Sequence, residues 1–140
     1  MNSRANPARM APDSRPAERR NLINKTILLV DDEQGYRDLL YMELSDRGYG
    51  VLTAGGGPEA LEILQREEVD IIITDMKMPK MDGLDVVIAS RQLRPGIPII
   101  LMTGYAIEGR VQEALALKAS VCLRKPFQIE ELETALRAAL

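Results

Sequence analysis

The sequence alternates between short, mostly β-branched apolar runs and longer segments in which apolar residues recur every three or four positions. The apolar runs cover residues 26–30, 51–54, 70–74, 97–102 and 120–123. The helical patterns lie within residues 36–44, 60–64, 84–88, 107–115 and 129–139. Strands that alternate with helices form a parallel sheet with helices on both faces. We therefore predict a single α/β domain over residues 23–140, with five parallel strands and five helices.

The length and composition agree with a soluble domain. The chain has 140 residues, of which 46% are hydrophobic and 28% charged, and this is enough for one sizeable core. No apolar stretch approaches the roughly 18 residues of a membrane span, and the N-terminus lacks the apolar segment of a signal peptide. Its single cysteine, Cys122, cannot form an internal disulfide. We expect a cytoplasmic protein that does not enter a membrane.

The first 22 residues differ from the rest of the chain. They carry five Arg against one Asp and one Glu, together with three Pro and no periodicity. We predict a disordered basic arm over residues 1–22 with a net charge of +3, which leaves −6 on the remaining chain. The acidic body argues against direct DNA binding by the folded domain.

The chain contains no histidine, and this limits the chemistry available to it. Nucleophile pairs that need an imidazole base and metal sites with histidine ligands are excluded. Carboxylates, hydroxyls and amines remain. Carboxylates without imidazole favour a hard cation such as Mg²⁺.

Polar residues follow the apolar runs at the points where the predicted strands end. Asp31 and Asp32 follow the first run, Asp75 the third, Thr103 the fourth and Lys125 the fifth. Ligands of open α/β sheets bind outside the carboxyl ends of the strands. Three carboxylates, one hydroxyl and one amine are therefore predicted to converge there, and a divalent cation would relieve the repulsion among the carboxylates.

Four motifs resemble those of a known family. The segments LLVDDE, IITDMKMPKMDG, ILMTG and LRKPF, in this order and spacing, resemble the response-regulator receiver domain of two-component signal transduction. The resemblance extends over about residues 25–140. It implies a doubly wound, flavodoxin-like sheet with strand order 2-1-3-4-5. It also implies a cis peptide bond between Lys125 and Pro126.

The resemblance also implies roles for single residues. Asp75 would accept a phosphoryl group from the phosphohistidine of a sensor histidine kinase or phosphotransfer protein. Asp31, Asp32, Asp75 and the backbone carbonyl of Lys77 would hold Mg²⁺. Lys125 and Thr103 would contact phosphoryl oxygens. The remaining contacts would come from two backbone N–H groups, those of Met76 and Gly104.

Each motif also has a simpler interpretation. Asp31 and Asp32 would suit the start of a helix, as an N-cap and a first-turn acid. Asp75 would suit a turn, and Lys125 an exposed surface position. A cap needs only one acid, however, and the four motifs together favour the metal site.

The chain departs from the pattern of the family in three respects. Cys122 stands where most members carry Tyr or Phe, so the usual aromatic switch is in doubt. Lys118 replaces a common glycine. Lys77 and Tyr105 occupy positions that tune dephosphorylation in the family.

Three functions are compatible with these motifs. The favoured one is a phosphoacceptor module, either a single-domain regulator or the receiver fragment of a longer regulator, that catalyses only its own phosphorylation and dephosphorylation. It would signal through a partner-binding face at residues 106–140, with homodimerisation left open. A Mg²⁺-dependent phosphohydrolase with an aspartyl nucleophile is an alternative. Phosphohydrolases of the haloacid-dehalogenase type, however, carry a second Asp two residues after the nucleophile, where this chain has Lys77. A receiver used only as an interaction module would be expected to have lost Asp32, Asp75, Thr103 or Lys125, and all four are present.

Overall fold

The computed structural model of the chain describes residues 24–104, 112–113 and 121–140. The basic arm predicted over residues 1–22 lies outside the described residues. So does most of the helix predicted within residues 107–115, together with Tyr105 and Lys118.

Five parallel strands form one sheet in the order β2-β1-β3-β4-β5. The strands are β1 (Thr26–Val30), β2 (Gly50–Ala54), β3 (Ile71–Asp75), β4 (Ile99–Thr103) and β5 (Val121–Arg124). Every residue of β3 and β4 is buried, as expected for central strands covered on both faces. The predicted doubly wound α/β fold and its strand order are confirmed.

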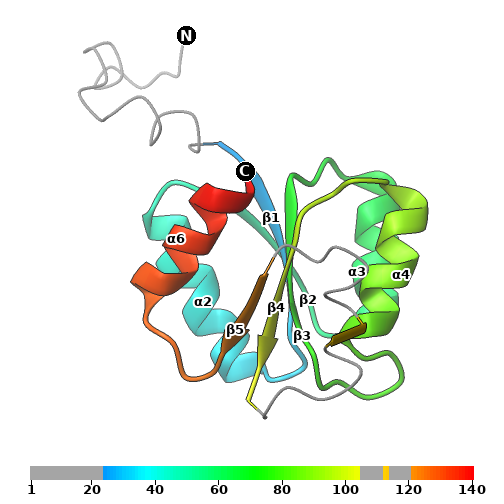
Figure 1. Ribbon diagram of the computed structural model, residues 1–140. Coiled ribbons are helices and arrows are strands. Elements are labelled where there is room, and N and C mark those ends of the chain that lie inside the picture. The colour runs from blue at the N-terminus through cyan, green and yellow to red at the C-terminus, as the bar shows by residue number, and fades with distance from the viewer. Residues whose placement is uncertain (1–23, 105–111, 114–120) are drawn as a thin grey trace, which may run out of the picture.

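Helices cover both faces of the sheet (Figure 1). The described helices are α2 (Gln34–Asp46), α3 (Gly57–Arg66), α4 (Gly83–Leu93) and α6 (Ile129–Ala139). Figure 1 shows α2 and α6 on one face, and α3 and α4 on the other. Two hydrophobic clusters match this arrangement, because successive strand residues point to opposite faces. Leu28 packs with α3 and α4 residues such as Leu64 and Val87, whereas Leu29 packs with Leu44 and Leu136 of α2 and α6.

The strand register brings the carboxyl ends of the central strands to one edge. Val30, the last residue of β1, pairs with Thr74 of β3, so Asp31 and Asp75 follow at the same level. Thr103, the last residue of β4, pairs with Arg124 of β5, and Lys125 comes next. The chemistry-bearing residues are therefore placed by strands buried on both faces.

The helices themselves are short. Within the described part of the chain, each helix is too short or too polar to cross a bilayer. At the start of α4, the side chain of Asp82 accepts the N–H of Asp85 (3.0 Å) while the Asp85 carboxylate accepts the N–H of Asp82 (3.1 Å). This capping box fixes the start of the helix that follows the β3 loop.

Candidate functional site

Three carboxylates meet at the carboxyl edge of the sheet, as the sequence predicted. Ligand oxygens of Asp31, Asp32 and Asp75 all lie within 4.8 Å of one another. Asp31 is fully buried and Asp75 is 8% exposed, whereas Asp32 is exposed. Hard divalent cations prefer such clusters of carboxylate oxygens. The acidic cluster, meaning these three residues, can therefore bind a metal ion.

Lys125 connects two of the carboxylates. Its Nζ donates a hydrogen bond to Oδ2 of Asp31 at 3.0 Å and lies 3.5 Å from Oδ1 of Asp75. The Lys125 N–H donates to the carbonyl oxygen of Thr103 at 2.7 Å, which ties the turn after β5 to the end of β4. The bond between Lys125 and Pro126 is cis, as predicted. Lys125 is therefore part of the site, as expected, and not a solvated surface lysine.

Asp31 serves both the cluster and the adjacent helix. Its Oδ1 accepts the N–H of Glu33 at 2.9 Å, and its carbonyl oxygen accepts a hydrogen bond from Arg37 of α2 at 2.6 Å. Glu33 is the N-cap of α2, but its side chain makes no capping hydrogen bond. The start of α2 thus uses one carboxylate, that of Asp31, and the cap interpretation leaves Asp32 unexplained.

The environment of Asp75 favours its neutral form. The pKa of Asp75 is raised from 3.8 to about 6, and burial is the largest cause of the rise. The negative charge of Asp31 also raises the pKa, whereas the ammonium of Lys125 and a backbone hydrogen bond from Met76 lower it. An additional cation beside Asp75 would therefore stabilise the charged form of this carboxylate.

The backbone after Asp75 is held closely against the sheet. The N–H of Met76 donates to the carbonyl oxygen of Met102 (2.8 Å), and the N–H of Gly83 donates to the carbonyl oxygen of Met76 (2.8 Å). A Cβ on Gly83 would lie only 2.9 Å from Cα of Met76 and 3.1 Å from the carbonyl oxygen of Asp75. The glycine therefore permits the loop to close tightly behind the acidic residue.

The remaining predicted residues lie at the same edge or beside it. Thr103 ends β4 and is 2% exposed, whereas Gly104 and Lys77 are exposed. Cys122 lies in β5 opposite Leu101, is half-buried, and packs against the cluster on the α3 and α4 face. Burial raises the pKa of the Cys122 thiol, which keeps the thiol neutral.

Sequence reasoning did not assign Tyr36, Arg37 and Phe127 to the site. Nζ of Lys125 lies 4.4 Å from the centroid of the Tyr36 ring, and the Phe127 ring meets Tyr36 edge-on at 6.3 Å between centroids. The helical spacing of the sequence places Tyr36 on the apolar face of a helix. The sequence feature that could have placed Tyr36 at the site is its position in the first helical turn after Asp31, because that turn starts at the carboxyl edge of the sheet.

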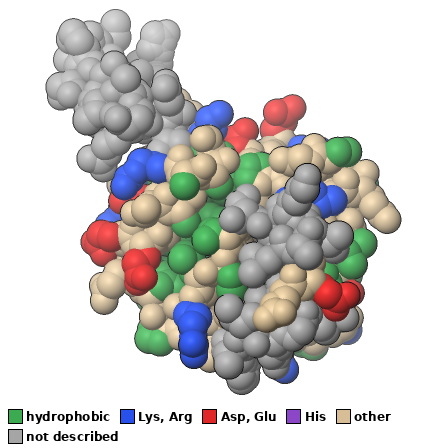
Figure 2. Space-filling view, viewed as in Figure 1, with side chains coloured by type: hydrophobic (Ala, Val, Ile, Leu, Met, Phe, Trp, Pro, Cys, Tyr) green, Lys and Arg blue, Asp and Glu red, His purple; other side chains and the backbone are tan. Residues whose placement is uncertain are grey.

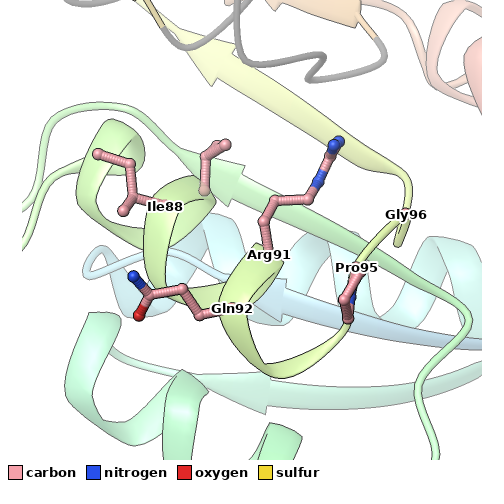
Figure 3. Close-up of a pocket in the computed structure, with 6 residues that line it drawn as sticks. Ile88, Arg91, Gln92, Pro95 and Gly96 are labelled. Carbon is pink, nitrogen blue, oxygen red and sulfur yellow. The ribbon is translucent and has the colours of Figure 1, made fainter.

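A separate cavity of about 340 Å³ lies elsewhere in the fold (Figure 3). Its walls include Ile88, Arg91 and Gln92 of α4 and Pro95 and Gly96 of the turn before β4. This turn enters the amino end of β4, whereas the acidic cluster lies at the carboxyl ends of the strands. The cavity is therefore not part of the site.

Comparisons with known proteins agree with this geometry. A family profile described as the response regulator receiver domain matches residues 27–137. Sporulation initiation phosphotransferase F of Bacillus subtilis (strain 168) is 35% identical over 119 residues, which make up 85% of this chain and 96% of that protein. Other curated relatives, most of them named as transcriptional regulators, are matched over 26% to 50% of their own length. The chain thus spans half of those proteins or less.

Solved structures show the same fold. The chemotaxis protein CheY4 of Vibrio cholerae matches with a TM-score of 0.78 and 36% identity, over 84% of this chain and 99% of that one. A response regulator protein from Burkholderia pseudomallei matches with a TM-score of 0.75 and 30% identity, over 81% and 66% of the two chains. Its crystal structure contains a phosphorylated aspartic acid and a calcium ion. From the family profile, the relatives and the fold together, this chain belongs to the response regulator receiver domain family.

Proposed function

We propose that Asp75 is the phosphoacceptor of this receiver domain. In the reaction, a carboxylate oxygen of Asp75 forms a bond to phosphorus while the bond from phosphorus to the imidazole nitrogen of the donor's phosphohistidine breaks. The imidazole keeps the electron pair. The position of Asp75 at the end of a buried strand, with the Lys125 ammonium 3.5 Å from its carboxylate, is the observation that carries this proposal.

The neighbours of Asp75 suit the charge that develops during transfer. Phosphoryl transfer spreads negative charge over three equatorial oxygens, so positioned cations and donors provide most of the catalysis. Lys125 supplies an ammonium, already oriented by Asp31 at 3.0 Å, and Thr103 supplies a hydroxyl from the end of β4. Gly104, an exposed residue at the same edge, would offer its backbone N–H. The Met76 N–H donates to the carbonyl oxygen of Met102 and also stabilises the Asp75 carboxylate, so it is the second backbone candidate for a phosphoryl contact.

We propose Mg²⁺ as the metal of the acidic cluster. Three carboxylates without imidazole or thiolate form a donor set that suits Mg²⁺. Asp31, Asp32, Asp75 and the backbone carbonyl of Lys77 would hold the ion. When bound, the ion would offset the repulsion between these carboxylates and an incoming phosphoryl group.

The partners follow from this assignment. The proposed donor is a sensor histidine kinase or a phosphotransfer protein in the cytoplasm. The proposed output is a change in partner binding at the face formed by residues 106–140, of which β5 and α6 are described. The acidic body, with acidic and basic side chains interspersed over the face in view (Figure 2), supports a protein partner more than direct binding to DNA.

The basic arm over residues 1–22 is proposed to flank a single receiver domain over 23–140.

A phosphohydrolase acting on external substrates is less well supported. Such an enzyme needs a general acid beside the aspartyl nucleophile. The residue two positions after Asp75 is Lys77, which is exposed and carries an ammonium. We therefore propose that the protein catalyses only its own phosphorylation and dephosphorylation.

Labelling with radioactive acetyl phosphate tests this function. Wild-type protein should incorporate label with Mg²⁺ and not with EDTA, and Asp75→Asn should incorporate none. Asp38→Asn, which changes an exposed carboxylate of α2, should be labelled like the wild type. Labelling of Asp75→Asn at the wild-type rate would refute the assignment.

A further inference from the structure

Aromatic residues are scarce in this chain, yet two of them gather beside Lys125. The sequence contains four Tyr, one Phe and no Trp. Nζ of Lys125 lies 4.4 Å from the centroid of the Tyr36 ring. The only Phe, Phe127, meets the same ring edge-on, with 78° between the ring planes and 6.3 Å between the centroids. This arrangement has no part in the roles assigned above.

The ammonium of Lys125 has three neighbours that differ in kind. Asp31 accepts its hydrogen bond at 3.0 Å, Asp75 lies at 3.5 Å, and the face of the Tyr36 ring forms a third side. An aromatic face attracts a cation within about 6 Å through its quadrupole, and the attraction grows when water is excluded. A ring also takes no proton from the ammonium and does not compete as an acceptor of strong hydrogen bonds.

The Tyr36 ring is placed by its helix and contacted by a second ring. Tyr36 lies in the first turn of α2, whose start is tied to the residue after β1 by the hydrogen bond from Arg37 to the carbonyl oxygen of Asp31. Phe127 supports the ring from the segment before α6. Burial, together with Asp31 and Asp75, raises the pKa of Tyr36 to about 12, so the phenol stays neutral at physiological pH. A neutral ring gives the lysine a fixed, uncharged wall.

We propose that Tyr36 is a positioning residue for phosphoryl transfer, because its ring holds the Lys125 ammonium beside Asp75 through a cation–π contact. The proposal rests on the function proposed for Asp75 and Lys125. In this proposal the aromatic ring of Tyr36, and not its hydroxyl, holds the Lys125 ammonium in place. The Phe127 edge contact keeps that ring in the orientation that faces the lysine.

Three variants separate the ring from the hydroxyl and from general packing. Tyr36→Leu removes the ring but keeps an apolar side chain, and Tyr36→Phe keeps the ring. Tyr41→Leu is the matched control, because Tyr41 lies on the same helix, is 44% exposed and is outside the site. Each variant is measured for its phosphorylation rate with acetyl phosphate and Mg²⁺. The ε-methylene NMR signal of Lys125 is recorded as well, since the ring current of a facing aromatic shifts it upfield.

Tyr36→Leu should slow phosphorylation by about 3- to 10-fold, which matches the usual strength of a partly desolvated cation–π contact. It should also move the Lys125 ε-methylene signal downfield. Tyr36→Phe should retain both the rate and the shifted signal, and Tyr41→Leu should match wild type in both.

The outcomes distinguish this inference from the proposed function. If Tyr36→Leu is folded and is phosphorylated as fast as wild type, while Asp75→Asn is not labelled, the positioning role is wrong and the phosphoacceptor stands. If Tyr36→Phe is as slow as Tyr36→Leu, the hydroxyl is the active part and the inference falls. If Tyr36→Leu fails to fold, Tyr36→Phe still tests the inference. A wild-type rate with the Lys125 signal still shifted upfield supports the ring, and a reduced rate or an unshifted signal overturns the inference. If wild-type protein is not labelled at all, the proposed function itself is wrong.

Discussion

Asp31, Asp32 and Asp75 lie close together but meet very different surroundings. Asp31 is buried and bonded through both carboxylate oxygens, one to the Glu33 N–H and one to Lys125. Asp75 is nearly buried, and Asp32 is exposed. Because burial penalises a charge unless partners compensate for it, equal substitutions at these positions should have unequal effects.

The raised pKa of Asp75 makes the stability of the metal-free protein depend on pH. The pKa of Asp75 rises from 3.8 in the unfolded chain to about 6 in the folded protein, so folding favours the protonated carboxyl. The resulting contribution of Asp75 to the free energy of unfolding is fully present below pH 3.8 and is lost as the pH rises through about 6. Asp75→Asn removes this ionisation. The variant should exceed wild type in unfolding free energy by on the order of 3 kcal/mol at pH 7, and by little near pH 4.

Urea unfolding between pH 4 and pH 7 in the presence of EDTA measures this difference. Asp38→Asn, at an exposed position on α2, should show no comparable trend. A stability difference between Asp75→Asn and wild type that stays constant with pH would contradict the account.

Asp31 and Asp32 should respond in opposite ways to substitution. Asp31→Ala leaves the Glu33 N–H without its acceptor and the Lys125 ammonium without its closest one, so it should lower the unfolding free energy by about 1–3 kcal/mol. Asp32→Asn removes only an exposed, repelling charge and should leave the metal-free protein as stable as wild type or slightly more stable. It should instead weaken Mg²⁺ binding.

Thermal unfolding with and without Mg²⁺ tests both statements. Saturating Mg²⁺ should raise the melting temperature of wild type, because a ligand that binds only the folded state stabilises it. Asp32→Asn should need more Mg²⁺ for the same increase. A marked loss of metal-free stability in Asp32→Asn would favour the helix-cap interpretation.

The sequence could predict the acidic cluster, Thr103 and Lys125 because parallel strands bring their carboxyl ends to one edge. It could not predict the role of Tyr36. A tyrosine at helical spacing fits a core face equally well, and its contact with Lys125 joins segments that are far apart in the chain. Contacts of this kind depend on tertiary packing and leave no local pattern.

At the scale of elements, the strands were predicted to within two residues, and the differences have local causes. Asp70 was predicted within a strand, but β3 begins one residue later and the Asp70 carboxylate accepts the N–H of Thr26 at 2.8 Å. The fourth strand was predicted from residue 97, but β4 begins at Ile99. Pro98 has no N–H to donate to a ladder, although its carbonyl oxygen accepts the N–H of Ile72.

The loop between β3 and α4 depends on one close backbone approach. A methyl group at Gly83 would meet the backbone of Met76 and Asp75, as the 2.9 Å and 3.1 Å distances show. Gly83→Ala should therefore lower the unfolding free energy by about 1–3 kcal/mol. It should also slow phosphorylation, because the backbone that the methyl group displaces follows directly on Asp75, the last residue of β3.

Gly35→Ala is the matched control for this prediction. Gly35 also lies in the first turn of a helix, but a Cβ there meets nothing within 4 Å. The substitution should be neutral or should stabilise by up to about 1 kcal/mol, as alanine favours the helix. Urea unfolding and phosphorylation rates of the two variants provide the comparison, and equal effects would argue against a steric cause.

At the scale of the whole molecule, the site occupies the edge of a rigid sheet packed on both faces. The two hydrophobic clusters anchor α2 and α6 on one side and α3 and α4 on the other (Figure 1). Such a scaffold can hold Asp31, Asp75 and Lys125 in register while the loops at the same edge respond to a new charge. The domain is thus suited to convert the covalent change proposed at Asp75 into the proposed change in partner binding.

The central claim is that the phosphoryl group resides on Asp75, and borohydride trapping tests it most directly. Borohydride reduces an acyl phosphate to an alcohol at the modified residue, which mass spectrometry of the digested protein then locates. After treatment of the wild-type protein with acetyl phosphate and Mg²⁺, the reduced residue should be found at Asp75 and should be absent without Mg²⁺. Reduction at Asp31 or Asp32, or at another carboxylate, with Asp75 unmodified would contradict the account.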